Sequence, residues 1–175
     1  YNDTQGMHPS QSTRTLFNSE KKDLQDLATL SRTKPHLRMF LDGPAGSGKS
    51  HVVRALLQYA AAYTTSLGLT FDMRTIVVTA LSGVAATSIG GETLHSAAAL
   101  NGSVDPERDQ SWLNARLLII DECSFMDTSQ VATLDVRLRA LMHRHNTLYG
   151  GLHILFCGDF RQLEPIAGTP LYSSR

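Results

Sequence analysis

The segment GPAGSGKS, residues 43–50, contains the residue types that bind a nucleotide phosphate. It fits the pattern GxxxxGK[ST] and stands between a short apolar run and a helical pattern, which is the context this loop requires. Its glycines allow backbone N–H groups to converge on a phosphate, because no β-carbon stands in the way. Lys49 is placed to reach the β and γ phosphates, and the Ser50 hydroxyl suits Mg²⁺. The predicted nucleotide-binding residues are Gly43, Pro44, Ala45, Gly46, Ser47, Gly48, Lys49 and Ser50.

Two acids, Asp121 and Glu122, follow the apolar run 117–120. Asp121 suits the Mg²⁺ shell, whereas Glu122 suits the polarisation of an attacking water molecule. A base directed at water favours hydrolysis over transfer to a bound acceptor. An acid pair after a strand also fits a helix start or a solvated turn, but the preceding phosphate loop favours the catalytic interpretation.

A third polar segment, GDFRQLEP at residues 158–165, follows the apolar run 152–157. A turn needs Gly, Asp and Pro, but it does not need Gln162. The amide at this position is therefore a candidate for a role other than forming the turn. We predict Glu122 and Lys49 as catalytic residues, with Ser50 and Asp121 holding Mg²⁺.

The segment TALSGVAATSIGGETLHS, residues 79–96, is dense in small and hydroxyl-bearing residues. Small residues permit close backbone approach, and hydroxyl and N–H groups can hold the phosphate oxygens of a nucleic-acid strand. A tightly packed helix of small residues explains the same composition. Both interpretations stay open at this point.

Four apolar runs without alternation, at residues 37–41, 76–79, 117–120 and 152–157, predict strands that are covered on both faces. Helical patterns separate them: an apolar face at 52–60 closed by Gly68, and another at 131–141 that Asp127 can cap. A further helix is predicted at 24–30, capped by Asn18 or Ser19. Strands that alternate with helices predict a parallel α/β sheet, whose ligands lie beyond the carboxyl ends of the strands.

The composition excludes several classes of protein. Sixteen basic residues balance sixteen acidic ones, so the charge provides no broad footprint for duplex DNA, and any nucleic-acid contact must be local. The two cysteines, Cys123 and Cys157, form neither a CxxC pair nor a zinc pattern, which favours a reducing compartment. No apolar run reaches the ~18 residues that span a bilayer.

Together, four segments resemble the Pif (petite integration frequency) DNA helicases of superfamily one, including their relatives encoded by mobile elements. They are GPAGSGKS, TALSGVAATSIGGETLHS, IIDECSFMD and YGGLHILFCGDFRQLEP, in the family's order and approximate spacing. The resemblance runs from about Phe17 to Ile166. The second and fourth segments are much more specific than a phosphate loop alone.

The resemblance implies a RecA-like P-loop NTPase lobe, with a mainly parallel sheet and helices on both faces, that binds ATP and Mg²⁺. Working with a second lobe, it would move 5′ to 3′ along single-stranded DNA in DNA repair, recombination or genome maintenance. Gln162 matches the family's residue on the γ-phosphate, where an amide can donate or accept and can respond to the loss of the phosphate. The resemblance therefore implies that Gln162 binds nucleotide and is a catalytic residue together with Glu122 and Lys49. Asp159 matches an acid that couples nucleotide state to DNA. Four residues match the segment that borders the DNA strand, namely Thr79, Gly83, His95 and Ser96.

Three positions depart from the family pattern. Lys21 stands where the family has the glutamine that reads adenine, Ser82 replaces a common threonine, and Glu164 replaces the first proline of QLPP.

The chain begins with Tyr1, so we expect a piece of a longer protein. We expect residues 1–15 to be a flexible polar lead-in and residues 16–175 to be the first lobe, without the second. Since arginines of the second lobe complete the family's ATP site, we expect the fragment alone to be a poor ATPase and no helicase.

We expect the protein to be monomeric and intracellular, in the nucleus or mitochondrion if the organism is eukaryotic. Two alternatives to a helicase lobe stay open. One is a P-loop phosphotransferase, which needs an acceptor pocket and an arginine-bearing lid. The other is a non-catalytic remnant of a mobile-element helicase, although the intact Lys49, Asp121 and Gln162 argue against decay.

Overall fold

The computed structural model describes residues 35–100, 102, 110–162, 165 and 168–173. The chain forms two units, Tyr1–Pro35 and His36–Arg175, and every element below belongs to the second unit. The predicted lead-in, the predicted helix at 24–30, Lys21 and Glu164 lie outside the described residues. Among the described residues, no helix is long and apolar enough to cross a membrane.

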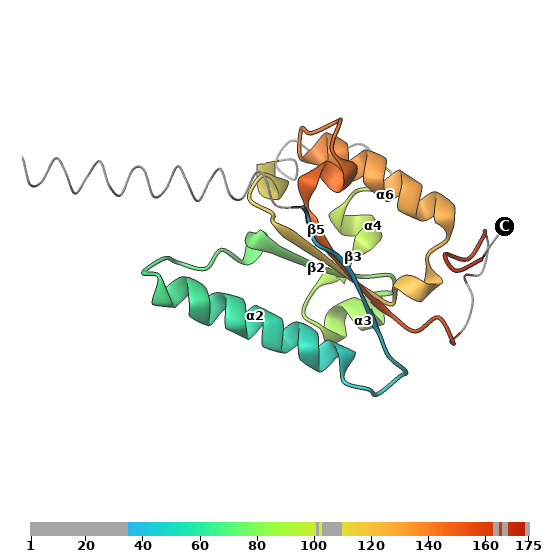
Figure 1. The fold of residues 1–175 in the computed structure, drawn as a ribbon, viewed down its shortest axis with the longest axis horizontal. Helices are drawn as coiled ribbons and strands as arrows, with labels where there is room; N and C mark the ends of the chain where they lie inside the picture. Colours follow the sequence, from blue (N-terminus) through green and yellow to red (C-terminus); the bar gives the residue numbers. More distant parts are fainter. Residues whose placement is uncertain (1–34, 101, 103–109, 163–164, 166–167, 174–175) are drawn as a thin grey trace, which may run out of the picture. The chain divides into compact units, whose positions relative to one another are not determined.

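A parallel sheet forms the centre of the described residues (Figure 1). Its strand order is β1-β5-β4-β2-β3, and each neighbouring pair is parallel. The strands are β1 (Arg38–Asp42), β2 (Ile76–Ala80), β3 (Glu92–Thr93), β4 (Leu117–Asp121) and β5 (His153–Gly158). The predicted parallel α/β fold and its four strands are confirmed. Sequence reasoning missed β3, because two residues are too few to form an apolar run.

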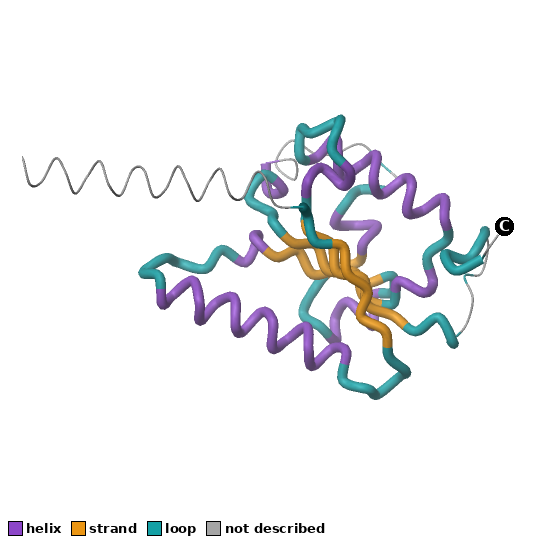
Figure 2. The backbone as a smooth tube through the Cα atoms, viewed as in Figure 1, coloured by secondary structure: helices purple, strands orange, loops and turns teal. Residues whose placement is uncertain are grey.

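Helices cover both faces of the sheet. They are α2 (Lys49–Ser66), α3 (Gly83–Ser88), α4 (Leu94–Ala97) and α6 (Thr128–Leu141), with short 3₁₀ helices η1 (Met73–Thr75), η2 (Cys123–Phe125) and η3 (Leu148–Gly151). Successive residues of β4 point to opposite faces: Leu118 and Ile120 pack with α4 and α6, whereas Ile119 packs with Val53 of α2. Figure 2 accordingly shows the strands in the middle, between α2 and α6.

The strand order decides which loops become neighbours. β5 lies between β1 and β4, so the turn after β5 is placed between the phosphate loop that follows β1 and the acid pair at the end of β4. The paired ends are nearly level, because Asp42 is opposite Gly158 and Ile120 is opposite Phe156. Three sequence segments that are far apart along the chain therefore meet at one edge of the sheet.

Two details of the predicted burial are wrong. β1 was expected to be covered on both faces, but among the described residues it is an edge strand, and Met39 and Phe40 are 45% and 39% exposed. Val52 was expected on the buried face of α2, but it is 48% exposed, while Val53 is fully buried. Apolar spacing alone does not show how wide a face the sheet covers.

Helix α6 begins as predicted. Asp127 accepts a hydrogen bond from the Gln130 backbone N–H at 2.8 Å, and the Gln130 side chain accepts one from the Asp127 N–H at 3.1 Å. This reciprocal capping box fixes the chain direction directly after the DECSFM segment. Leu134, Leu138 and Leu141 then point into the core, so that the helix anchors the segment carrying the acid pair.

Gly91, which precedes β3, is a place where a side chain does not fit. A Cβ atom at Gly91 would lie 2.3 Å from the backbone oxygen of Val78. We expect Gly91→Ala to lower the free energy of unfolding by about 1–3 kcal/mol, because backbone must shift to relieve the overlap. Urea denaturation measures this loss. Gly83→Ala is the matched control, since no atom lies within 4 Å of its added Cβ; equal losses in the two variants would contradict the explanation.

Candidate nucleotide-binding site

The phosphate loop leaves β1 and enters α2 directly. Gly46 and Gly48 have φ angles of +75° and +97°, in the left-handed region that side chains disfavour. The loop also contacts β5, because the Gly43 N–H donates to the Gly158 carbonyl at 3.2 Å. The strand, glycine loop and helix predicted from the sequence are therefore continuous, with the loop attached to the neighbouring strand.

Lys49, the first residue of α2, curls back over the loop. Its Nζ donates to the Gly43 carbonyl and to the Pro44 carbonyl, the latter at 3.1 Å. The ammonium group is consequently held against the loop by two of the loop's own carbonyls. A phosphate that enters the loop offers this cation a charged acceptor in exchange for two neutral carbonyls.

The acid pair combines a buried carboxylate with a backbone turn. Asp121 ends β4, is 6% exposed, and accepts the Glu122 N–H at 2.9 Å through Oδ1. Glu122 has φ 57° and ψ 30°, the left-handed conformation that is uncommon for a residue with a side chain. This turn directs Glu122 away from the line of the strand. Its Oε2 accepts a hydrogen bond of 2.8 Å from the Ser82 hydroxyl.

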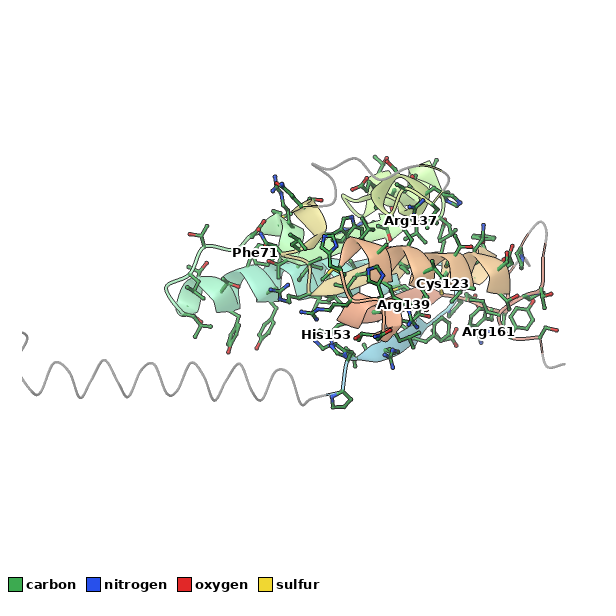
Figure 3. All side chains as sticks on the ribbon, turned by 90° about the horizontal axis from the view of Figure 1, so that it is seen from above. Phe71, Cys123, Arg137, Arg139, His153 and Arg161 are labelled. Carbon is green, nitrogen blue, oxygen red and sulfur yellow. The ribbon has the colours of Figure 1, made fainter. Side chains whose placement is uncertain are left out.

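Gln162 belongs to a hydrogen-bonded turn after β5. Its side-chain Nε2 donates to Asp159 Oδ2 at 3.2 Å, and its backbone N–H donates to the Asp159 carbonyl at 3.1 Å. Asp159 is buried, and its Oδ1 accepts the Arg161 N–H at 2.9 Å. The Arg161 guanidinium also forms an ion pair with Asp42, the residue before the phosphate loop, with 3.8 Å between Nη2 and Oδ2. Figure 3 shows Arg161 and Cys123 toward the same end of the sheet.

We expect Asp159 to make this turn sensitive to acid. The backbone N–H of Arg161, together with the side chains of Arg161 and Gln162, lowers the pKa of Asp159, although desolvation opposes them. A carboxyl group with a lowered pKa stabilises the fold above its unfolded pKa of about 3.9, and the contribution is lost as the pH falls through the lower folded pKa. Asp159→Asn should therefore be destabilised relative to the wild type near neutral pH, and that difference should shrink below about pH 4. Unfolding free energies measured against pH test this, and a difference independent of pH would contradict it.

The three strand ends enclose one cavity of about 400 Å³. Of the predicted site residues, the cavity is lined by Ala45, Gly46, Gly48, Lys49, Ser50, Asp121, Glu122 and Gln162. Gly43, Pro44 and Ser47 belong to the loop but do not line the cavity, and Gly43 is buried. The structure therefore places the glycine loop, the acid pair and the amide around a single space.

Ser50 and Asp121 have the chemistry that a magnesium ion requires. Both line this cavity, and hydroxyl and carboxylate oxygens are ligands that Mg²⁺ prefers. No group of three or more His, Cys, Asp or Glu side chains in the described ranges is arranged to hold a metal ion. Mg²⁺ bound with substrate phosphates needs only one or two carboxylates, so this pair fits.

Sequence reasoning missed Arg54, which also lines the cavity. Its guanidinium donates to the Ser88 carbonyl at 3.2 Å, so that it bridges α2 and the end of α3. A signal was available, because Arg54 follows Ser50 by four residues and positions i and i+4 share a helix face. Ser124 and Phe125 line the cavity as well, from η2 after the acid pair.

The cysteines beside the site are packing residues. Burial raises the pKa of both Cys123 and Cys157 to about 12, so neither is a thiolate near neutral pH. Both are almost completely buried in the two core clusters.

The segment 79–96 is partly packed into the core and partly exposed. Ala85, Ala86 and Ile89 pack into a small core cluster. Thr79 is fully buried, and its hydroxyl donates to the Ile119 carbonyl at 2.8 Å, so its side chain joins β2 to β4 and does not reach the surface. Gly83 and Ser96 are exposed, and His95 is half-buried.

A second cavity, of about 610 Å³, adjoins the nucleotide cavity. It is lined by Leu81, Ser82, His95, Glu122, Phe125, Asp127, Gln130 and Pro165. Glu122 and Phe125 line both cavities. Of the residues predicted to border DNA, His95 is the one that lines this space.

The PIF1-like helicase family model matches residues 16–173. The chain belongs to the PIF1-like helicase family. Its relatives include the ATP-dependent DNA helicase PIF5 of Trypanosoma brucei brucei, 36% identical over 140 residues that cover 73% of this chain and 14% of that protein. Another is the ATP-dependent DNA helicase PIF1 of Saccharomyces cerevisiae, 31% identical over 144 residues that cover 75% of this chain and 16% of that protein. The chain thus spans a small part of the length of these helicases.

Solved Pif1 structures share the fold. Pif1 helicase from Candida albicans is 28% identical, with a TM-score of 0.62 over 93% of this chain and 35% of that chain. Bacteroides sp Pif1 in complex with ADP-AlF4 is 25% identical, with a TM-score of 0.60 over 93% of this chain and 34% of that chain. Bacteroides Pif1 bound to ssDNA is 25% identical, with a TM-score of 0.59 over 82% of this chain and 32% of that chain. The predicted RecA-like fold class is confirmed.

Proposed function

We propose that these residues are the ATP-binding lobe of an ATP-dependent DNA helicase that moves 5′ to 3′ along single-stranded DNA. The observation that carries the proposal is the convergence of Lys49, the Asp121–Glu122 pair and Gln162 around one cavity at the carboxyl ends of β1, β4 and β5. Family membership supports the same assignment. Relatives named as ATP-dependent DNA helicases indicate the substrate.

Each residue has a role that follows from its position. Lys49 and the loop N–H groups bind the β and γ phosphates, replacing the carbonyls that Lys49 contacts in this structure. Ser50 and Asp121 would hold Mg²⁺, which would supply neutralisation of the charge on the phosphates. Glu122 accepts a proton from the attacking water, and Gln162 binds the γ-phosphate.

Release of the γ-phosphate can alter the rest of the lobe through the hydrogen bonds of Gln162. Gln162 is hydrogen-bonded to Asp159, which in turn is bound by Arg161. Loss of the phosphate would return the Gln162 amide to Asp159, so the turn after β5 has two alternative sets of partners. A change of partners of this kind is how a nucleotide state alters a neighbouring segment.

We propose that the DNA strand borders the exposed Gly83 and Ser96 and the half-buried His95, while the buried Thr79 supports that surface from inside. A second RecA-like lobe would complete the ATP site with arginines. An arginine that stabilises the transition state contributes about 10³–10⁵ to the rate of hydrolysis. The protein would then act in DNA repair, recombination or genome maintenance, in the nucleus or mitochondrion if its organism is eukaryotic.

Hydrolysis and unwinding by the full-length protein test the proposal. We expect single-stranded DNA to increase the ATP hydrolysis rate, and we expect duplexes with a 5′ single-stranded tail to be unwound in preference to duplexes with a 3′ tail. Unwinding from a 3′ tail alone would contradict the direction. Hydrolysis that does not respond to DNA would contradict the helicase assignment, and ATP-dependent phosphorylation of an added acceptor would replace it with a phosphotransferase.

A further inference from the structure

Glu122 stands in the wall between two cavities. It lines the 400 Å³ nucleotide cavity together with Lys49 and Gln162, and it also lines the 610 Å³ cavity together with Ser82 and His95. Its carboxylate is therefore within reach of events on either side. The groups that hydrogen-bond to its oxygens determine which of the two cavities the carboxylate faces.

The Ser82 hydroxyl holds one of these oxygens. It donates to Glu122 Oε2 at 2.8 Å, across 40 positions of sequence. The same hydroxyl caps α3 by accepting the Ala85 N–H at 3.2 Å. Other hydroxyls of this segment are used differently, since Thr87 and Ser88 donate to backbone carbonyls of their own helix. Ser82 thus joins the exposed start of α3 to the candidate base.

A hydroxyl has one hydrogen to donate, so Ser82 cannot hold Glu122 and a second acceptor at once. Ser82 is exposed and lines the second cavity, where a phosphate oxygen of a bound strand would compete for that hydrogen. The negative charge of the phosphate would also repel Glu122 toward the nucleotide cavity. A carboxylate released from the Ser82 hydroxyl is free to turn toward the nucleotide cavity, which it also lines.

We propose that Ser82 is a positioning residue that restrains Glu122 until a phosphate of single-stranded DNA takes its hydroxyl, so that ATP hydrolysis depends on DNA. This inference rests on the proposed function, because it assigns Glu122 as the base and the second cavity as part of the DNA path. The coupling between DNA binding and ATP hydrolysis then depends on one hydrogen bond, from the Ser82 hydroxyl to Glu122.

The test is steady-state ATP hydrolysis by the full-length protein, with and without an oligothymidylate strand. We expect Ser82→Ala to raise the DNA-free turnover number by about fivefold or more, the lower end of usual coupling between sites. The KM for ATP should stay unchanged, and the DNA-saturated rate should stay within about twofold, so the stimulation by DNA falls. Ser82→Thr retains the hydroxyl and should behave as the wild type.

Two controls separate restraint from helix capping. Ser82→Ala also removes the cap of α3, whereas glycine is well tolerated at an N-cap. Ser82→Gly should therefore raise the DNA-free rate as Ser82→Ala does. Thr87→Ala removes an exposed hydroxyl from the same helix and should leave the stimulation unchanged. Nucleotide affinity measured on each variant verifies that it is folded.

The outcomes distinguish this inference from the function on which it rests. If the wild type is stimulated by DNA but both hydroxyl-deleted variants keep the wild-type ratio, or lose both rates together, the restraint by Ser82 is overturned and the helicase assignment stands. If the wild type does not hydrolyse ATP, or does so without response to DNA, the proposed function and this inference fail together.

Discussion

Replacing Glu122 with glutamine is expected to lower ATP hydrolysis by the full-length protein by roughly 10²–10⁴-fold, the usual contribution of a positioned general base. ATP affinity should change little, because Lys49, Ser50 and the loop N–H groups are untouched. The amide keeps the shape of Glu122 and still presents an oxygen to the Ser82 hydroxyl, so the hydrogen bond between α3 and η2 survives. Only the ability to accept the proton of water is lost.

Single-turnover hydrolysis, measured beside equilibrium ATP binding, separates the chemical step from affinity. Glu92→Gln is the matched control, since Glu92 is an exposed acid on β3 that does not line the nucleotide cavity. It should hydrolyse ATP at the wild-type rate. An E122Q variant with near wild-type hydrolysis would remove Glu122 from the catalytic role and leave it as a residue of the turn.

Replacing Lys49 with alanine is expected to weaken ATP binding by about 10–100-fold, the value of a hydrogen bond to a charged group. Hydrolysis should fall further, by roughly 10²–10³-fold, because the ammonium also stabilises charge that develops on the phosphates. In this structure the Lys49 Nζ is held by two loop carbonyls, so its position before phosphate contact is already fixed.

Arg74→Ala supplies the control for loss of a positive charge. Arg74 lies in η1, is exposed, and does not line the nucleotide cavity. Calorimetric titration with ATP and Mg²⁺ should give wild-type affinity for Arg74→Ala and weakened affinity for K49A. If the two variants bound ATP equally well, the phosphate-binding role of the loop would be refuted and a non-catalytic remnant would be favoured.

Local patterns in the sequence predicted where the glycine loop, the acid pair and Asp127 lie relative to the strands and helices. The glycine loop is recognisable because GxxxxGK[ST] must follow a strand and open a helix, and both neighbours have clear apolar patterns. The acid pair is recognisable because a buried strand ends at Asp121. Asp127 is recognisable because an amphipathic helix begins directly after it. These predictions depend on contacts between residues close in sequence.

Local patterns alone did not predict the features that depend on distant contacts. No local pattern places β5 between β1 and β4, yet that order brings Gln162 beside the other site residues. Thr79 belongs to a segment whose composition is typical of a surface, but its side chain is buried. Its hydroxyl donates to the carbonyl of Ile119, which lies 40 residues away in the neighbouring strand. The hydrogen bond from Ser82 to Glu122 likewise needs β2 and β4 to lie side by side.

The most direct test of the central claim, that three strand ends form one ATP site, is a crystal structure of the protein with ADP, Mg²⁺ and aluminium fluoride. We predict that the Lys49 ammonium leaves the Gly43 and Pro44 carbonyls for the β-phosphate and fluoride, with Ser50 and Asp121 at the metal. Glu122 should face the attacking water, and the Gln162 amide should contact the fluoride. Nucleotide bound elsewhere, or a Lys49 that keeps its loop carbonyls beside bound nucleotide, would contradict the account.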